Sequence, residues 1–203
     1  MSFKKKPNRS ANQFISNIKG LRVSVCCQPD SYHNSWIREL QRERLEITQI
    51  WPIPADRFDL GMDILICDYF PQMGNFIPWV PGDSKAALVV VLPQNGQYDE
   101  GVLLSTAPQC VIQRPISNSH LSTTLKVAWS QYKYERRLVD RISKLDENVR
   151  SARNIERAKM LIMNKQKIGE EAAYSYIRNL AMKRQLSVSH LASEILNNPH
   201  QVL

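Results

Sequence analysis

The 203-residue sequence lacks the features that would assign it to several large classes of protein. It has no apolar run of the roughly 18 residues that a membrane-spanning helix needs, and its basic N-terminus lacks the apolar segment of a secretory signal. We therefore expect a cytoplasmic protein with no membrane partner. It also has no Gly-rich phosphate loop, no nucleophile elbow and no paired catalytic acids. We expect neither enzymatic activity nor a cofactor.

Cysteine is scarce and has no metal-site spacing. The four cysteines, Cys26, Cys27, Cys67 and Cys110, lie in or beside apolar strand-like runs. No Cys-x-x-Cys pair and no nearby His pair accompanies them, which argues against a zinc site. We interpret them as reduced packing residues. The alternative is a redox pair between Cys27 and Cys67, whose strands should be neighbours.

The net charge of +8 is unevenly distributed. Residues 1–20 hold five basic residues and no acid, and we expect a basic flexible tail there. Residues 21–125 carry seven basic against eleven acidic residues, whereas residues 126–203 carry fifteen against eight. This asymmetry predicts two functional halves, of which the C-terminal one faces a polyanion.

Residues 21–125 alternate between short apolar runs and amphipathic segments. The runs LRVSVCC, LEITQIW, MDILIC, AALVVVL and CVIQRP predict five strands, and SWIRELQRER has helical spacing. This pattern predicts an α/β fold, a flavodoxin-like (receiver-like) doubly wound sheet of five parallel strands. Three prolines between Tyr69 and Ser84 predict a loop or a broken helix there. We expect its Phe76 and Trp79 to cover the sheet; the alternative is a contact surface for a partner.

A single helix is predicted from about Ser119 to Lys167. It carries an apolar seam at spacings of four, three, four and three, typical of a short coiled coil. The seam consists of Leu138, Ile142, Leu145, Val149 and Ala152. We assign residues 126–152 to a coiled coil that mediates a homodimer. Two heptads alone are marginal, so dimerisation would need help from the flanking domains.

Residues 153–203 predict a three-helix unit. Gly169 is expected to end the long helix, a second helix runs from Glu170 to about Lys183, and Ser187 is a suitable N-cap for a third.

This C-terminal stretch resembles an ANTAR domain, the RNA-binding module of bacterial antitermination regulators. The matching residues are Ile155, Ala158, Lys159, Leu161, Met163, Ala173, Tyr174, Arg178, Ala181, Met182, Leu191 and Ala192. The upstream part, most clearly IWPIPADRFDLGMDILICDYF, resembles the receiver-like domain of amidase-regulator antiterminators. The resemblance implies a pseudo-receiver, a coiled coil and an ANTAR domain in that order.

Comparison with phosphorylated receivers places Asp68 at the phosphoacceptor position. The acidic pair that should share Mg²⁺ with it falls on Cys27 and Gln28, the Thr/Ser position falls on Leu92, and Arg114 takes the Lys position. A thiol and an amide are poor Mg²⁺ ligands. We interpret these five residues as a pseudo-phosphoacceptor pocket in which Arg114 pairs permanently with Asp68.

The ANTAR resemblance implies RNA contacts in the basic C-terminal part. Our candidates are Arg157, Lys159, Tyr174, Arg178, Lys183 and Arg184, with cations on phosphates and Tyr174 stacking on a base. Tyr174 packing between helices and Lys159 as a solvated residue are the alternatives. Met160, Met163 and Met182 are expected in the core.

We therefore expect a homodimeric transcription antitermination regulator that binds leader mRNA hairpins and prevents terminator formation. The resemblance implies control by a ligand-sensing protein of the periplasmic-binding-protein type. The alternative is a response regulator phosphorylated at Asp68 with a DNA-binding C-terminal domain, for which QLSVSHLASEIL would supply the recognition helix.

Overall fold

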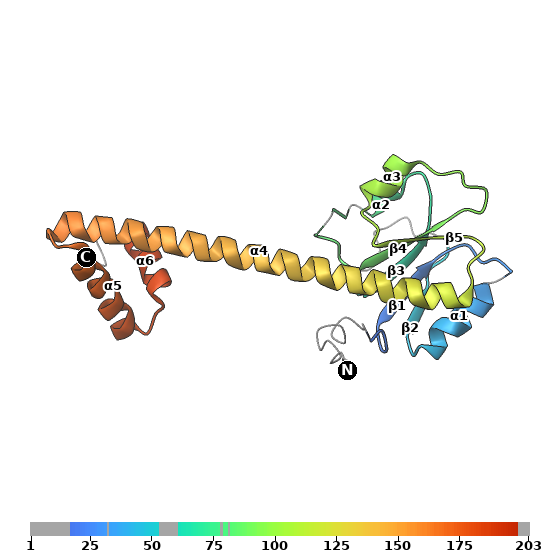
Figure 1. Ribbon diagram of the computed structural model, residues 1–203, viewed down its shortest axis with the longest axis horizontal. Helices are drawn as coiled ribbons and strands as arrows, with labels where there is room; N and C mark the ends of the chain where they lie inside the picture. Colours follow the sequence, from blue (N-terminus) through green and yellow to red (C-terminus); the bar gives the residue numbers. More distant parts are fainter. Residues whose placement is uncertain (1–16, 32, 53–60, 78, 81, 199–203) are drawn as a thin grey trace, which may run out of the picture. The chain divides into compact units, whose positions relative to one another are not determined.

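The computed structural model describes residues 17–31, 33–52, 61–77, 79–80 and 82–198 (Figure 1). Its elements are β1 (Arg22–Cys26), α1 (His33–Arg42), β2 (Glu46–Gln49), β3 (Ile64–Asp68), α2 (Met73–Phe76), β4 (Ala87–Leu92), α3 (Glu100–Ser105), β5 (Cys110–Gln113), α4 (Asn118–Gln166), α5 (Glu170–Arg184) and α6 (Val188–Asn197). They form two compact units, which divide after Leu138. The predicted boundaries at residues 126 and 153 both fall inside α4.

The first unit is a five-stranded parallel sheet in the order β2-β1-β3-β4-β5. The central strands β3 and β4 are almost wholly buried, as their continuous apolar sequences require. This order confirms the predicted receiver-like fold.

Helices cover both faces of this sheet (Figure 1). On one face α1 contributes Trp36 and Leu40, and the first turns of α4 contribute Leu121 and Leu125. Ile18 is 1% exposed and packs in the same core, so the flexible tail predicted for residues 1–20 does not extend to Ile18. The rest of that prediction, residues 1–16, lies outside the described residues.

The opposite face is covered by α2, α3 and the segment between β3 and β4. Trp79 is 7% exposed there, and Phe76 packs against the same cluster. The prediction that these aromatics cover the sheet is confirmed. Among its described residues, the segment contains one helix, the single turn α2, as its prolines predicted.

The second unit contains α4 from Val139 onward together with α5 and α6, and its core is formed by the last turns of α4 and the two short helices. Ala158 and Ile162 of α4 pack against Ile177 of α5 and against Leu191 and Ile195 of α6. The Ser187 hydroxyl accepts a hydrogen bond from the His190 amide at 3.1 Å, so the predicted N-cap of α6 is confirmed.

The end of α4 differs from the prediction. The left-handed residue that terminates it is Lys167, at φ 58°, whose amide bonds to the Met163 carbonyl at 2.9 Å. Gly169 has φ −74° and instead precedes α5 as its N-cap.

Within the described residues, no helix is both long and apolar enough to cross a membrane.

Candidate functional site

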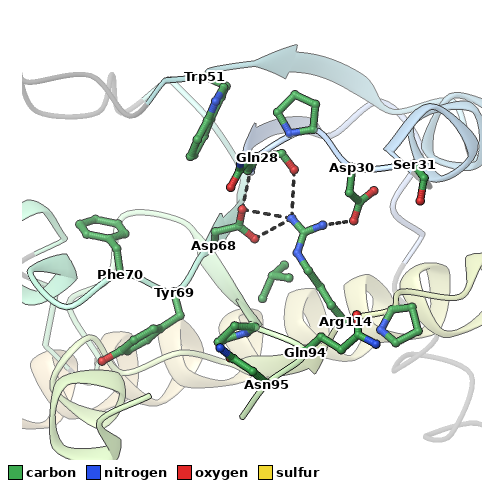
Figure 2. Close-up of a pocket in the computed structure, with 14 residues that line it drawn as sticks. Gln28, Asp30, Ser31, Trp51, Asp68, Tyr69, Phe70, Gln94, Asn95 and Arg114 are labelled. Atoms are coloured by element: carbon green, nitrogen blue, oxygen red, sulfur yellow. Dashed lines mark hydrogen bonds and ion pairs between the residues drawn. The ribbon is translucent and has the colours of Figure 1, made fainter. Parts of the chain in front are cut away.

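A pocket of ≈ 640 Å³ opens at the carboxyl edge of the sheet, where the strands deliver Asp68 and Arg114 (Figure 2). Asp68 is the last residue of β3, and Arg114 follows β5. Aromatic side chains lie on one side of Asp68, and the Arg114 guanidinium lies on the other. The lining residues are Gln28, Pro29, Asp30, Ser31, Trp51, Asp68, Tyr69, Phe70, Val91, Pro93, Gln94, Asn95, Arg114 and Pro115.

Both carboxylate oxygens of Asp68 are engaged by other groups of the pocket. Arg114 Nη2 lies 2.9 Å from Oδ1 and 3.1 Å from Oδ2, and the backbone N–H of Gln28 donates to Oδ2 at 2.6 Å. The side chains of Asp68 and Arg114 are only 17% and 15% exposed. A partly desolvated, charge-assisted pair of this kind is stronger than a surface ion pair.

Arg114 ties three segments of the first unit together. Besides Asp68, its guanidinium contacts the Asp30 carboxylate and donates to the Gln28 carbonyl at 3.1 Å. It also lies over the Trp36 ring, 5.9 Å from the centroid. Burial by itself would lower the pKa of Arg114, but the hydrogen bond and charge of Asp68, with the charge of Asp30, raise it overall. The guanidinium therefore remains charged throughout the physiological range.

The other two residues of the predicted pocket lie outside it. Cys27 is 1% exposed, packs in the core under α1 and α4, and donates from Sγ to the Ile66 carbonyl. Burial, and then the charge of Asp68, raise the pKa of this thiol well above its ordinary value. Leu92 packs in the opposite core. Neither side chain lines the pocket, and no group of three potential metal ligands occurs among the described residues.

The four cysteines form no disulfide in the described part of the chain. Cys67 of β3 is the register partner of Cys26, and these two side chains share one core whereas Cys27 lies in the other. The alternative of a Cys27–Cys67 pair is therefore wrong, because adjacent residues of a strand point to opposite faces. Cys110 is half-buried and the other three are buried, in line with a packing role.

In the second unit, five of the six predicted RNA-binding residues are exposed. Arg157 lies on α4, and Tyr174, Arg178, Lys183 and Arg184 lie on α5. Arg184 also approaches Glu194 at 3.6 Å, as a solvent-exposed pair. The exposed cations form a surface that attracts a polyanion.

Lys159 is placed differently from the other candidates. It is 7% exposed, and its Nζ lies 2.6 Å from Glu170 Oε1 and 2.9 Å from Glu156 Oε1. Hydrogen bonds, first to Glu170 and then to Glu156, raise the pKa of Lys159. The bond between Lys159 and Glu170 also lowers the pKa of Glu170. Because Glu170 opens α5, the ammonium joins the end of α4 to the start of α5. This placement favours a structural role over the predicted RNA contact.

Comparison with known proteins bears on both units. Residues 143–196 match the ANTAR domain family. This match lies within the second unit, which we therefore call the ANTAR domain. Upstream of it, the similarity extends along nearly the whole chain: the sequence is 24% identical over 196 residues to the aliphatic amidase regulator of Pseudomonas aeruginosa, covering 93% of this chain and 97% of that protein. The expected resemblance to the amidase regulators is confirmed.

A structural comparison supports the receiver-like fold. The response regulator StyR superposes with a TM-score of 0.54 at 11% identity, covering 86% of this chain and all of that one. At this level of identity the likeness concerns the fold alone.

The ANTAR domain has two exposed residues that the sequence reasoning missed. Met160 and Met182 are each 61% exposed, so the expectation that they lie in the core was wrong. Met163 does pack against the core. Tyr174, Arg178 and Met182 follow one another at intervals of four along α5, which places an aromatic ring, a guanidinium and a thioether on one side of the helix. The signal that would have found Met182 is this spacing.

The predicted coiled-coil seam on α4 is exposed in the single chain. Leu138, Ile142, Leu145 and Val149 are 39%, 58%, 62% and 49% exposed, and Ala152 is exposed as well. An unburied apolar row of this length on a helix is the kind of surface that a second helix covers.

Proposed function

We propose that this protein is an RNA-binding transcription antitermination regulator that acts as a homodimer on hairpins of a leader mRNA. The single observation that carries the proposal is the ANTAR domain, folded as three helices, whose α5 exposes Tyr174, Arg178 and Lys183. Cations supply affinity for phosphates, and an exposed aromatic ring supplies a stacking surface for an unpaired loop base.

Binding alone is sufficient for the proposed activity, and no catalytic step is required. A dimer that prefers one fold of the leader RNA stabilises an alternative hairpin, and bases in that hairpin are withdrawn from the terminator. Arg157, Lys183 and Arg184 hold backbone phosphates, while Tyr174 and Arg178 contact loop bases. Lys159 holds the end of α4 and the start of α5 together and affects RNA binding only through the positions of these helices.

The dimer is formed by the seam Leu138, Ile142, Leu145, Val149 and Ala152 of α4. These side chains are exposed in one copy and have the spacing that pairs with a second copy. A dimer presents two ANTAR domains, and two linked binding events raise the overall affinity for paired hairpins.

Control of this regulator does not run through phosphorylation of Asp68. The Arg114 guanidinium and the backbone N–H of Gln28 already bond to the carboxylate. The residues at the acidic-pair positions offer a buried thiol and a side-chain amide instead of carboxylates. We infer that a protein partner, a ligand-sensing repressor of the periplasmic-binding-protein type, holds the regulator inactive. The similarity to the aliphatic amidase regulator supports this inference.

A salt titration of RNA binding tests the proposal. The full-length protein is titrated against a leader RNA with two hairpins and, in parallel, against a duplex DNA of equal length. We expect tight RNA binding that persists at moderate salt, together with weak DNA binding. Equal binding to both that is lost at moderate salt would show only a basic surface and would overturn the proposal.

A further inference from the structure

The pocket at the carboxyl edge of the sheet has the size of a site for a small organic molecule. Its volume of ≈ 640 Å³ lies within the range of about 300–1,000 Å³ that is usual for ligand sites. Residues that follow β1 and β3 line it, and these two strands are neighbours in the sheet although β2 lies between them in the chain. Open α/β sheets bind ligands at such a point, outside the carboxyl ends of the strands. The pocket thus has the place of a ligand site even though its carboxylate is already paired.

One wall of this pocket is aromatic. Trp51, which follows β2, is 44% exposed, and Tyr69 and Phe70 follow β3 as half-buried rings. Figure 2 shows the three rings on one side of the ion pair. Tyr69 Oη accepts a hydrogen bond from the backbone N–H of Asp99 at 2.9 Å, and Phe70 packs edge-to-face on Phe76 with the centroids 5.4 Å apart. Because these contacts already hold two of the rings, a ligand with an apolar body packs on them without first having to order them.

The floor of the pocket has a negative balance of charge. Among the described lining residues, the charged groups are the carboxylates of Asp30 and Asp68 and the guanidinium of Arg114, which sum to −1. The neighbouring thiol of Cys27 reports the same sign: after burial, which is the largest cause, the charge of Asp68 raises its pKa more than the charge of Arg114 lowers it. The guanidinium therefore cancels only part of the field of the carboxylate.

These two features select the chemistry of the ligand. The lining charge repels an anion and attracts a cation, and the faces of aromatic rings attract a cation as well. The carboxamides of Gln94 and Asn95 also line the pocket and supply oxygen acceptors for an N–H donor. A metal ion is disfavoured, because no group of three potential protein ligands for it occurs among the described residues.

We propose that this pocket binds a small organic cation, an ammonium group on an apolar body, with the ammonium at the Asp68 carboxylate and the body against Trp51 and Phe70. Oδ1 of Asp68 accepts from Arg114 Nη2, and a carboxylate oxygen has a second acceptor position for an N–H of the ligand. The site lies wholly in the first unit, so its occupancy depends neither on the proposed RNA binding nor on the dimer.

Three probes of similar shape and different charge test the proposal. The full-length protein is titrated by isothermal calorimetry with 2-phenylethylammonium, 2-phenylethanol and phenylacetate. We expect the ammonium to bind at least roughly tenfold more tightly than the alcohol, and phenylacetate to bind more weakly than either. Equal affinities would show only an apolar surface and would overturn the proposal. Absence of ammonium binding, or displacement of the ammonium by Mg²⁺ at constant ionic strength, would overturn it as well.

Charge variants locate the ammonium. Asp68→Asn removes one carboxylate with little change of shape and is expected to weaken ammonium binding at least roughly tenfold. Because Asp68→Asn also alters the partner of Arg114, Gln94→Lys is the second variant: it brings the lining charge to zero at an exposed position and should cause a similar loss. Asp83→Asn is the matched control, because the Asp83 side chain is 70% exposed and does not line the pocket, and we expect a change of less than about twofold. Unchanged affinity in Gln94→Lys would contradict the proposal.

Tryptophan fluorescence locates the apolar body of the probe. Trp51 is more exposed than the other three tryptophans. The ammonium probe is therefore expected to change the emission of the unmodified protein, and this change should be absent in Trp51→Leu. An equal change in Trp51→Leu would place the probe elsewhere on the protein and would overturn the assignment to this pocket.

Discussion

Arg114 and Asp68 form an ion pair of 2.9 Å at the carboxyl edge of the sheet, at the two positions where a phosphorylated receiver would carry its lysine and its phosphoacceptor. The guanidinium also contacts Asp30, and the backbone N–H of Gln28 donates to Oδ2 of Asp68. In the proposed pseudo-phosphoacceptor pocket, the oxygens of Asp68 are thus already bonded to groups of the protein.

Removal of Arg114 should destabilise the first unit. Arg114→Ala leaves two carboxylates without their cation, and we expect a loss of about 2–3 kcal/mol in the free energy of unfolding. Arg42→Ala is the matched control, because its ion pair with Glu39 joins a side chain that is 77% exposed, and its loss should cost under about 0.5 kcal/mol. Urea denaturation measures both, and equal losses would contradict the role given to Arg114.

Asp68 should not accept a phosphoryl group. Incubation with acetyl phosphate and Mg²⁺ is expected to leave the intact mass of the protein unchanged, because the carboxylate is paired and the positions of the acidic pair hold Cys27 and Gln28. A phosphorylated receiver in the same buffer is the positive control. A gain of one phosphoryl group that Asp68→Asn abolishes would support the alternative of a phosphorylation switch.

Lys159 and Arg178 should differ in their effect on the salt dependence of RNA binding. Arg178→Ala removes an exposed cation and should reduce the slope of log K against log[salt] by about one. Lys159→Met should leave the slope unchanged and lower the melting temperature of the ANTAR domain, because its ammonium bonds to Glu170 and Glu156. Circular dichroism confirms that each variant is folded at the binding temperature. A reduced slope in Lys159→Met would restore its assignment as an RNA contact.

The row Tyr174, Arg178 and Met182 should carry part of the RNA affinity. Tyr174→Ala is expected to weaken binding to the hairpin loop by about 1–3 kcal/mol, the usual value of one base stacked on an aromatic ring. Met182→Ala should show a smaller loss in the same direction. Met160→Ala is the control of equal exposure on α4. Filter binding with looped and fully paired RNA measures the difference, and an equal loss on paired RNA would argue against base stacking.

Acid should weaken the contact between α4 and the end of α1. Glu43 accepts from Ser122 Oγ at 2.6 Å and from Lys126 Nζ at 2.8 Å, and these bonds, first that of Lys126, lower the pKa of Glu43 below 4.5. Because the folded pKa lies below the unfolded one, the contribution to stability is present above pH 4.5 and is lost as pH falls through the folded pKa. Stability of Glu43→Gln should therefore fall less steeply than that of the unmodified protein below pH 4.5. Parallel curves from urea melts would contradict this.

Much of the fold could be predicted because the sequence patterns that specify its strands and helices are local. Runs such as ALVVVL are apolar throughout and specify buried parallel strands, and Ser187 specifies the start of α6 through one hydroxyl. The end of α4 was misplaced because a glycine was expected at the left-handed position, and Lys167 adopts it instead. The burial of Ile18 was also not predicted, because a single apolar residue in a basic segment forms no repeating apolar pattern.

The sequence by itself determined the receiver-like class of fold, the three-helix ANTAR domain and the residue types at the phosphoacceptor positions. Each of these depends on the order of residues within a short segment. The sequence also suggested the pair of Arg114 with Asp68, but only the tertiary structure decided the other side-chain placements. In that structure, Cys27 and Leu92 pack in the cores on opposite faces of the sheet, Lys159 is buried between Glu156 and Glu170, and Met182 is exposed. The physical reason is that burial and pairing depend on the packing of segments distant in sequence, and a periodic pattern describes only one element at a time.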